Sequence, residues 1–326
     1  MPNIVRSTRR DPLSGMTFRS VIHTLEMDRA SAAAAEPSPT SSELLGHPPD
    51  ARVLIVNCDD FGMHQDINTA VIDSIEQGIA SSCSLMRVCP AAPQAVGLLQ
   101  NRPHIRFGIH LTLVRDSAQD HWEPLSPNTA VPSLLDDTGL LRTFTPAGRA
   151  ELLARARLPE VEAEFRAQIN AVVDTGLMPT HLDFHCLADG GRADILELTM
   201  TLAAEYGVAV RVWLEPGRRK ARQRGLPVVD HDFLDSFALD VAGKAARYTQ
   251  LLRDLPAGLT EWAVHPSMGG EQSQMIGSGW RVRRTDYEFL VSRQARELLD
   301  REGIVVIDYT TLRDAWVQAG PTPTER

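Results

Sequence analysis

The sequence predicts an α/β protein with the fold of a deformed β/α (TIM-like) barrel of about seven parallel strands. The first observation is that short apolar runs alternate with segments of helical periodicity from about residue 52 to residue 316. The second is that four of these runs lead into an acid or a histidine. Parallel strands gather their carboxyl ends at one rim, so we expect the active site at that C-terminal rim.

The elements follow in a regular order. The first strand, at 53–58, is a continuous apolar run, and a helix at 67–77 repeats apolar residues with helical spacing until Gly78 ends it. Further strands are expected at 82–88, 106–109, 180–184, 208–212, 260–264 and 304–307. Further helices are expected at 90–100, 159–175, 193–206, 241–255 and 291–302. The alternation predicts a closed or nearly closed barrel.

Three long connections interrupt this pattern, at 113–148, 215–237 and 266–284. Long irregular connections usually serve as lids or binding loops. The second one carries a basic patch, which we expect to face water rather than to bind an anion. The patch consists of Arg218, Arg219, Lys220, Arg222 and Arg224.

The domain prediction is one barrel at 51–320, preceded by an N-terminal extension at 1–50. The extension combines scattered arginines with a run rich in alanine, serine and proline, a composition that buries too little apolar surface to fold. Its acidic residues argue against an organelle transit segment, and it has no apolar stretch typical of a secretory signal. We therefore expect a disordered extension or a misplaced start codon.

The composition argues against some classes of binding partner and indicates a cellular location. The formal net charge of −9 argues against a nucleic-acid partner, which needs clustered Lys and Arg. No run of about 18 apolar residues is present, so no membrane span is expected. The four cysteines lack paired spacing, which favours a reducing, cytoplasmic location. Cys186 follows a histidine, and both a metal-ligand role and a small buried apolar role remain open for it.

Acids and histidines at the strand ends suggest a divalent metal site. Asp59 and Asp60 follow the first strand, and His110, His185 and His265 follow three others. Imidazole suits zinc, whereas carboxylate and water suit magnesium, and a catalytic site needs only about three protein ligands. The remaining groups are then available as acid and base. A simple strand-to-helix turn is the alternative for the Asp pair.

Alternate residues of one strand share a face, so His181, Asp183 and His185 are expected to point together. Asp183 is suited to orient a metal-bound imidazole, because ligating histidines usually donate their second N–H to a carboxylate or a carbonyl. For His181, structural support and direct function remain equally open. The sequence has no nucleophile elbow, no Walker A motif and no dinucleotide fingerprint in the right context.

Several motifs together resemble the YdjC-like carbohydrate deacetylases, in the same order and over nearly all of 52–316. The matching segments are 57–62, 84–86 with 90–92, 108–111, 179–183 with His185, 207–211, and Glu261 with His265 and Pro266. The resemblance implies a deformed β/α barrel that removes acetyl from an N-acetylated sugar, in an oligosaccharide or a glycolipid, with one divalent metal, Mg²⁺ or Zn²⁺. A homodimer is compatible with such a barrel.

The resemblance also implies residue roles. Asp60, His110 and His185 would hold the metal, while Asp59 would act as general base and His265 as general acid. Arg211 would orient Asp59 or hold substrate, and the supporting residues would be His181, Asp183 and Glu261. Phe184, Cys186 and Leu187 depart from the family pattern, which puts the choice of sugar in doubt.

Two other functions remain open on the residues alone. Another metal-dependent barrel enzyme, such as a phosphodiesterase or a sugar isomerase, would use the same rim. The second is a non-catalytic protein that binds a carbohydrate or a glycolipid, having kept the residues of the rim but lost turnover.

Overall fold

The computed structural model describes residues 39–232, 234–275 and 279–319. Residues 1–38 of the predicted extension lie outside this part. Residues 39–50 are described, and they include the short helix α1 (Ser41–Leu44), which Thr40 and Glu43 cap reciprocally. The backbone N–H of Ser41 donates to Asp230 at 2.8 Å, so this segment packs on the body of the protein.

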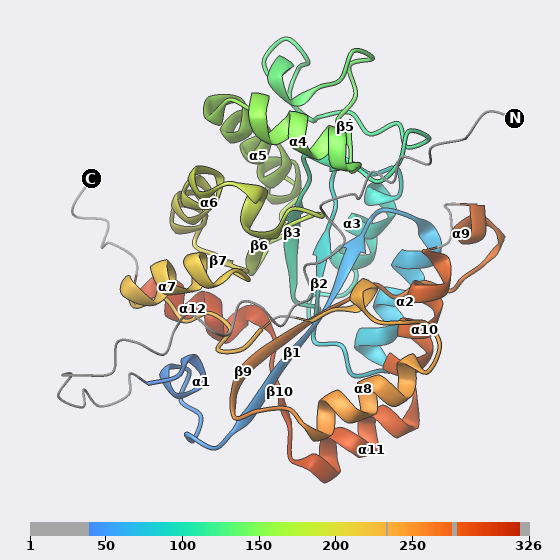
Figure 1. Cartoon of the computed structure of the whole chain (residues 1–326), viewed down its shortest axis with the longest axis vertical. Coiled ribbons are helices and arrows are strands. Elements are labelled where there is room, and N and C mark those ends of the chain that lie inside the picture. The colour runs from blue at the N-terminus through green and yellow to red at the C-terminus, as the bar shows by residue number, and fades with distance from the viewer. Residues whose placement is uncertain (1–38, 233, 276–278, 320–326) are drawn as a thin grey trace, which may run out of the picture. The chain divides into compact units, whose positions relative to one another are not determined.

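A curled parallel sheet forms the centre of the protein (Figure 1). Its strand order is β7-β6-β3-β2-β1-β9-β8, and β10 also pairs with β1. The strands are β1 (Arg52–Phe61), β2 (Ser82–Leu85), β3 (Phe107–Leu111), β6 (His181–Phe184), β7 (Ala209–Val210), β8 (Leu234–Asp235), β9 (Gly258–Val264) and β10 (Val305–Val306). All seven predicted strands are present, and β8 is an addition. The sheet ends at β7 and β8 as a half-barrel, which confirms the deformed barrel. The prediction that the barrel is closed or nearly closed is wrong, because β7 and β8 do not pair with each other in the described part of the chain.

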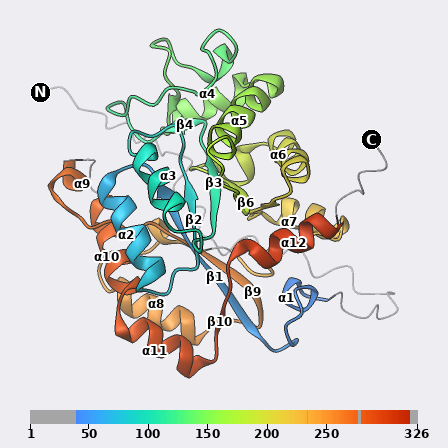
Figure 2. The same cartoon turned by 180° about the vertical axis from the view of Figure 1, so that it is seen from behind.

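Helices surround the curled sheet on its outer side, as the two opposite views show (Figures 1 and 2). The six predicted helices occur with small shifts at their ends. They are α2 (Gln65–Glu76), α3 (Ala92–Gln100), α5 (Leu158–Val173), α6 (Ala193–Tyr206), α8 (Lys244–Arg253) and α11 (Arg293–Glu302). Within the described ranges, no helix combines the length and the apolar character needed to cross a membrane.

The three long connections contain more regular structure than predicted. The additional elements in or overlapping these connections are β4 (Val114–Arg115), η1 (Pro132–Leu134), β5 (Arg142–Thr143), α4 (Pro146–Arg155), α7 (Glu215–Gln223), η3 (Ser236–Ala238), α9 (Glu271–Met275) and α10 (Trp280–Leu290). Two further elements that were not predicted, η2 (Ala188–Gly191) and α12 (Tyr309–Ala319), lie outside them. The basic patch lies largely on α7, where Arg218 pairs with Glu215 and Lys220 pairs with Glu197. Such charged, short helices carry little apolar periodicity, so the pattern from which helices were predicted is weak there.

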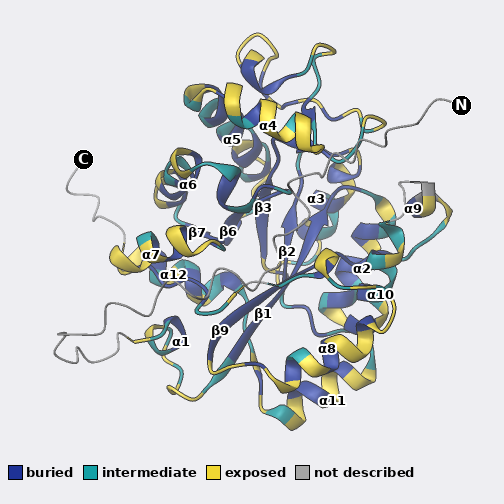
Figure 3. Ribbon diagram, in the orientation of Figure 1, coloured by how far each residue is buried: buried dark blue, intermediate teal, exposed yellow. Residues whose placement is uncertain are grey.

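Burial explains why strand ends can carry a shielded site. Every residue of β1 from Val53 to Phe61 is buried, including Asp59 and Asp60. Figure 3 shows buried strands at the centre and helices whose outer faces are exposed. Burying one large aliphatic side chain contributes roughly 1.5–3 kcal/mol, so the apolar part of β1 holds the polar end in place.

Candidate functional site

Strand register brings the predicted rim residues together. His110 of β3 lies opposite Asp183 of β6, and Gly108 lies opposite His181 on the same pair of strands. β1 and β9 are paired up to Cys58 and Val264, so Asp59 and His265 follow at the same level. Four segments that are distant in the sequence therefore meet at one edge of the sheet.

Asp60, His110 and His185 form a tight group. The distance from Asp60 Oδ1 to His110 Nε2 is 3.4 Å, and to His185 Nδ1 it is 3.2 Å. All three residues are at most 3% exposed, and their ligand atoms lie within 4.8 Å of one another. Asp60 has a φ of 65°, a left-handed conformation that is uncommon for a residue with a side chain and that is frequently found at functional sites.

A carboxylate stands behind each imidazole of this group. His110 Nδ1 lies 2.9 Å from Asp183 Oδ1, and His185 Nε2 lies 2.7 Å from Asp116 Oδ1. If each of these nitrogens donates its proton, the lone pairs of the other two nitrogens face Asp60. This is the usual arrangement of metal-binding histidines. Asp116 lies in an irregular connection, where no sequence pattern marked it.

The electrostatics of the site favour a cation. Burial lowers the pKa of His110, but the carboxylates of Asp183 and Asp59 outweigh it and raise that pKa to about 9. In the same way, burial raises the pKa of Asp60, whereas Arg283 and the two histidines hold it well below its ordinary value. The carboxylates thus stabilise positive charge at His110, and Asp60 remains an ionised carboxylate. A divalent ion on one carboxylate and two imidazoles fits this donor set.

Arg211 fixes Asp59 in one orientation. Its Nη1 and Nη2 donate to the two carboxylate oxygens of Asp59 at 2.8 and 2.9 Å. Nε donates to Glu261 at 2.8 Å, and Glu261 accepts a further hydrogen bond from Tyr309 at 2.6 Å. Nη1 also lies 2.8 Å from Asp183. Of the two roles open for Arg211, these contacts favour orienting Asp59.

His265 is held from behind by a hydroxyl and a carboxylate. Ser236 Oγ lies 2.8 Å from His265 Nδ1 and donates to Asp286 Oδ2 at 2.5 Å. The same Asp286 oxygen accepts the backbone N–H of His265 at 2.9 Å. Because the Ser236 hydroxyl donates its hydrogen bond to Asp286, its oxygen can accept a hydrogen bond from His265 Nδ1–H. Ser236 belongs to a predicted irregular connection and Asp286 follows another one, so no sequence pattern marked either residue.

His181 lies inside the protein beside Ser84 and Tyr309. It is fully buried and stacks on Tyr309 with ring centroids 3.6 Å apart. Burial lowers its pKa to about 3, which keeps the imidazole neutral at ordinary pH. Its Nε2 lies 3.2 Å from Ser84 Oγ, a hydroxyl that also donates to Asp183 at 2.6 Å.

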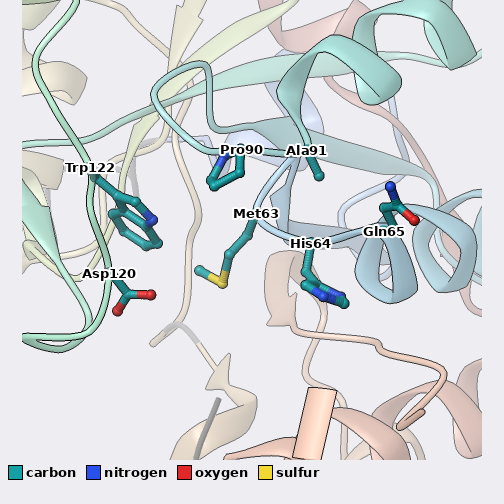
Figure 4. Close-up of a pocket in the computed structure, with 7 residues that line it drawn as sticks. All are labelled: Met63, His64, Gln65, Pro90, Ala91, Asp120 and Trp122. Carbon is teal, nitrogen blue, oxygen red and sulfur yellow. The ribbon is translucent and has the colours of Figure 1, made fainter. Parts of the chain in front are cut away.

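Two hollows adjoin the group around Asp60. The larger, about 340 Å³, is drawn in Figure 4. It is lined by Met63, His64, Gln65, Pro90, Ala91, Asp120 and Trp122. The ring of Trp122 also meets that of His185 edge to face, at 5.7 Å between centroids.

The smaller hollow, of about 100 Å³, is bordered by Asp116 and Arg283. Arg283 Nη2 donates to Asp60 at 2.6 Å. Its Nη1 is buried and has no hydrogen-bond partner among the described residues. A buried donor without a partner is costly, and a ligand oxygen in this hollow would satisfy it.

Comparison with known proteins agrees with the sequence motifs. A carbohydrate deacetylase of Thermoanaerobacter pseudethanolicus is 28% identical over 262 residues, covering 80% of this chain and 100% of that protein. Another, of Brevibacillus brevis, is 30% identical over 262 residues, covering 79% and 99%. A crystal structure from Enterococcus faecalis shares the fold, with a TM-score of 0.68, 23% identity, and coverage of 80% and 99%. The sequence model of the YdjC-like proteins matches residues 53–301, and this chain therefore belongs to the YdjC-like family.

Proposed function

We propose that this protein is a metal-dependent carbohydrate deacetylase that removes acetyl from an N-acetylated sugar unit of an oligosaccharide or a glycolipid. The observation that carries the proposal is the convergence of Asp60, His110 and His185, with the carboxylate of Asp59 fixed beside them. The curated relatives named carbohydrate deacetylase, aligned over nearly their whole length, support the same reaction.

Asp60, His110 Nε2 and His185 Nδ1 would hold the ion, Mg²⁺ or Zn²⁺. When bound, such an ion lowers the pKa of a water molecule and polarises the acetamide carbonyl. Asp59, oriented by Arg211, accepts the proton of the attacking water. Nη1 of Arg283, which has no hydrogen-bond partner in the described part of the chain, would donate to an oxygen of the substrate.

The departing nitrogen needs a proton, because an amide nitrogen leaves poorly as an anion. We assign this step to His265, whose ring is held by Ser236. Nδ1–H donates to the serine hydroxyl, so a second proton on Nε2 is the one available for transfer. Asp286, behind Ser236, stabilises the positive charge of the doubly protonated ring.

The direct test is acetate release from N-acetylglucosamine oligomers, with and without a chelator. We expect chelation to abolish release and Asp59→Asn to reduce it at least about 100-fold, because a general base contributes on that scale. Asp137→Asn, which changes an exposed acid that has no role in the proposed mechanism, is the matched control. Equal activity with and without chelator and in Asp59→Asn would reject the mechanism. Phosphate or an isomerised sugar as the product would reject the reaction.

A further inference from the structure

Asp116, His185 and Cys186 form a second group of metal-ligand atoms beside the first. His185 Nε2 lies 2.7 Å from Asp116 Oδ1 and 3.4 Å from Cys186 Sγ. Cys186 Sγ lies 3.9 Å from the same Asp116 oxygen. Tetrahedral zinc, with bonds of about 2.0–2.3 Å, places its ligand atoms roughly 3.3–3.8 Å apart, so small shifts would let one ion touch all three.

We propose that Asp116, His185 Nε2 and Cys186 form a second metal position, selective for a thiophilic divalent cation such as Zn²⁺ or Cd²⁺. The selectivity follows from the sulfur ligand, because thiolate prefers soft and borderline ions, whereas Mg²⁺ prefers oxygen. On binding, a metal–sulfur bond forms and the thiol proton passes to solvent.

Access distinguishes Cys186 from the other cysteines. Cys58, Cys83 and Cys89 are buried, whereas Cys186 is half-buried. Asp116 is half-buried as well, with 30% of its side chain exposed, and it lines the smaller hollow. An ion from solvent can therefore reach this pair without opening the sheet.

His185 is shared by the two groups, and its two nitrogens face opposite ways. Nδ1 faces Asp60, and Nε2 faces Asp116 and Cys186. A neutral imidazole has one lone pair for a metal, so an ion on Nε2 leaves the proton on Nδ1, where it is donated to Asp60. His185 is then lost to the first group. Excess Zn²⁺ should therefore inhibit the enzyme. This inhibition rests on the proposed function, whereas metal binding by Asp116, His185 and Cys186 does not.

Cadmium titration tests the binding directly, through the ultraviolet charge-transfer absorption of a thiolate bound to Cd²⁺. We expect the band to saturate at one equivalent, to vanish in Cys186→Ser and to persist in Cys89→Ala, which removes another thiol near His185. Asp116→Asn should weaken the apparent affinity at least about tenfold. A band that survives in Cys186→Ser, or a wild-type protein without one, overturns the proposal.

The double variant Asp60→Asn with His110→Ala separates this site from the first one. It should keep the thiolate band and lose acetate release. A band without acetate release in the wild-type protein would reject the proposed function and keep this site. Where acetate is released, inhibition by excess Zn²⁺ should be at least about tenfold weaker in Cys186→Ser. Equal inhibition in the two proteins would overturn the inhibitory role.

Discussion

Gly108 leaves room for the buried imidazole of His181 on the neighbouring strand. A Cβ atom at position 108 would lie 2.4 Å from His181 Nε2, closer than any real contact. The imidazole cannot withdraw, because Tyr309 stacks against its other side. Glycine is therefore required at position 108 because a side chain would not fit, and not because of its backbone conformation.

We expect Gly108→Ala to lower the free energy of unfolding by about 1–3 kcal/mol, because it overfills a packed core. Gly97→Ala is the matched change, since Gly97 lies in α3 and, beyond the local backbone of that helix, no described atom lies within 4 Å of the added carbon. It should stabilise the protein by about 0.5–1 kcal/mol. Urea unfolding of both variants measures the contrast, and equal effects of the two would contradict this account of the packing.

Two short elements from the long connections, η3 and α10, hold His265 of the β9 end. η3 supplies Ser236, and α10 supplies Asp286, which also accepts a hydrogen bond from Tyr248 at 2.8 Å and pairs with Lys244 of α8. His265 at the end of a sheet strand is therefore positioned by two elements outside the sheet, and α8 in turn holds Asp286.

Ser236→Ala should reduce kcat about tenfold or more, with little change in KM, because His265 loses the hydroxyl that orients it. Ser236→Thr keeps a hydroxyl and should recover part of the loss. Steady-state kinetics on an N-acetylated oligosaccharide, with urea unfolding to confirm that both variants are folded, provides the measurement. An alanine variant with full kcat, or a threonine variant as impaired as alanine, would show that Ser236 does not position His265.

At the scale of the whole molecule, one guanidinium joins three strands of the barrel. Arg211 contacts Asp59 of β1, Asp183 of β6 and Glu261 of β9. If all three buried carboxylates were ionised, their negative charge would exceed the single positive charge of Arg211. Burial raises the pKa of Glu261 to about 7, although Arg211 and the hydroxyl of Tyr309 act in the opposite direction.

The raised pKa of Glu261 makes stability depend on pH. Folding favours the protonated carboxyl, so its contribution is fully present below the ordinary value of 4.5 and is lost as the pH rises through about 7. Relative to Glu261→Gln, the wild-type protein should lose on the order of 3 kcal/mol between about pH 4.5 and about pH 7. Urea unfolding of both proteins with chelator present gives the comparison. A difference that does not change with pH would show that Glu261 does not titrate in this range.

Much of the fold could be predicted because local sequence patterns indicate most of its strands and helices. Continuous apolar runs such as 53–58 and helical periodicity such as that of α6 mark elements that bury their own side chains. The predicted rim residues were also visible, because a polar residue directly after a buried strand stands out in the sequence. α7 and α10 were missed because most of their residues are charged or polar.

The sequence by itself determined the class of fold, the family, and the acids and histidines at the strand ends. Only the tertiary structure decided which residues contact these groups. Asp116 contacts His185, and Arg283 donates to Asp60. Ser236 contacts His265 and is itself bound to Asp286. The physical reason is that these contacts join residues far apart in the chain. Arg283 and Asp60, for example, are separated by 223 positions, and no local period records such a pairing.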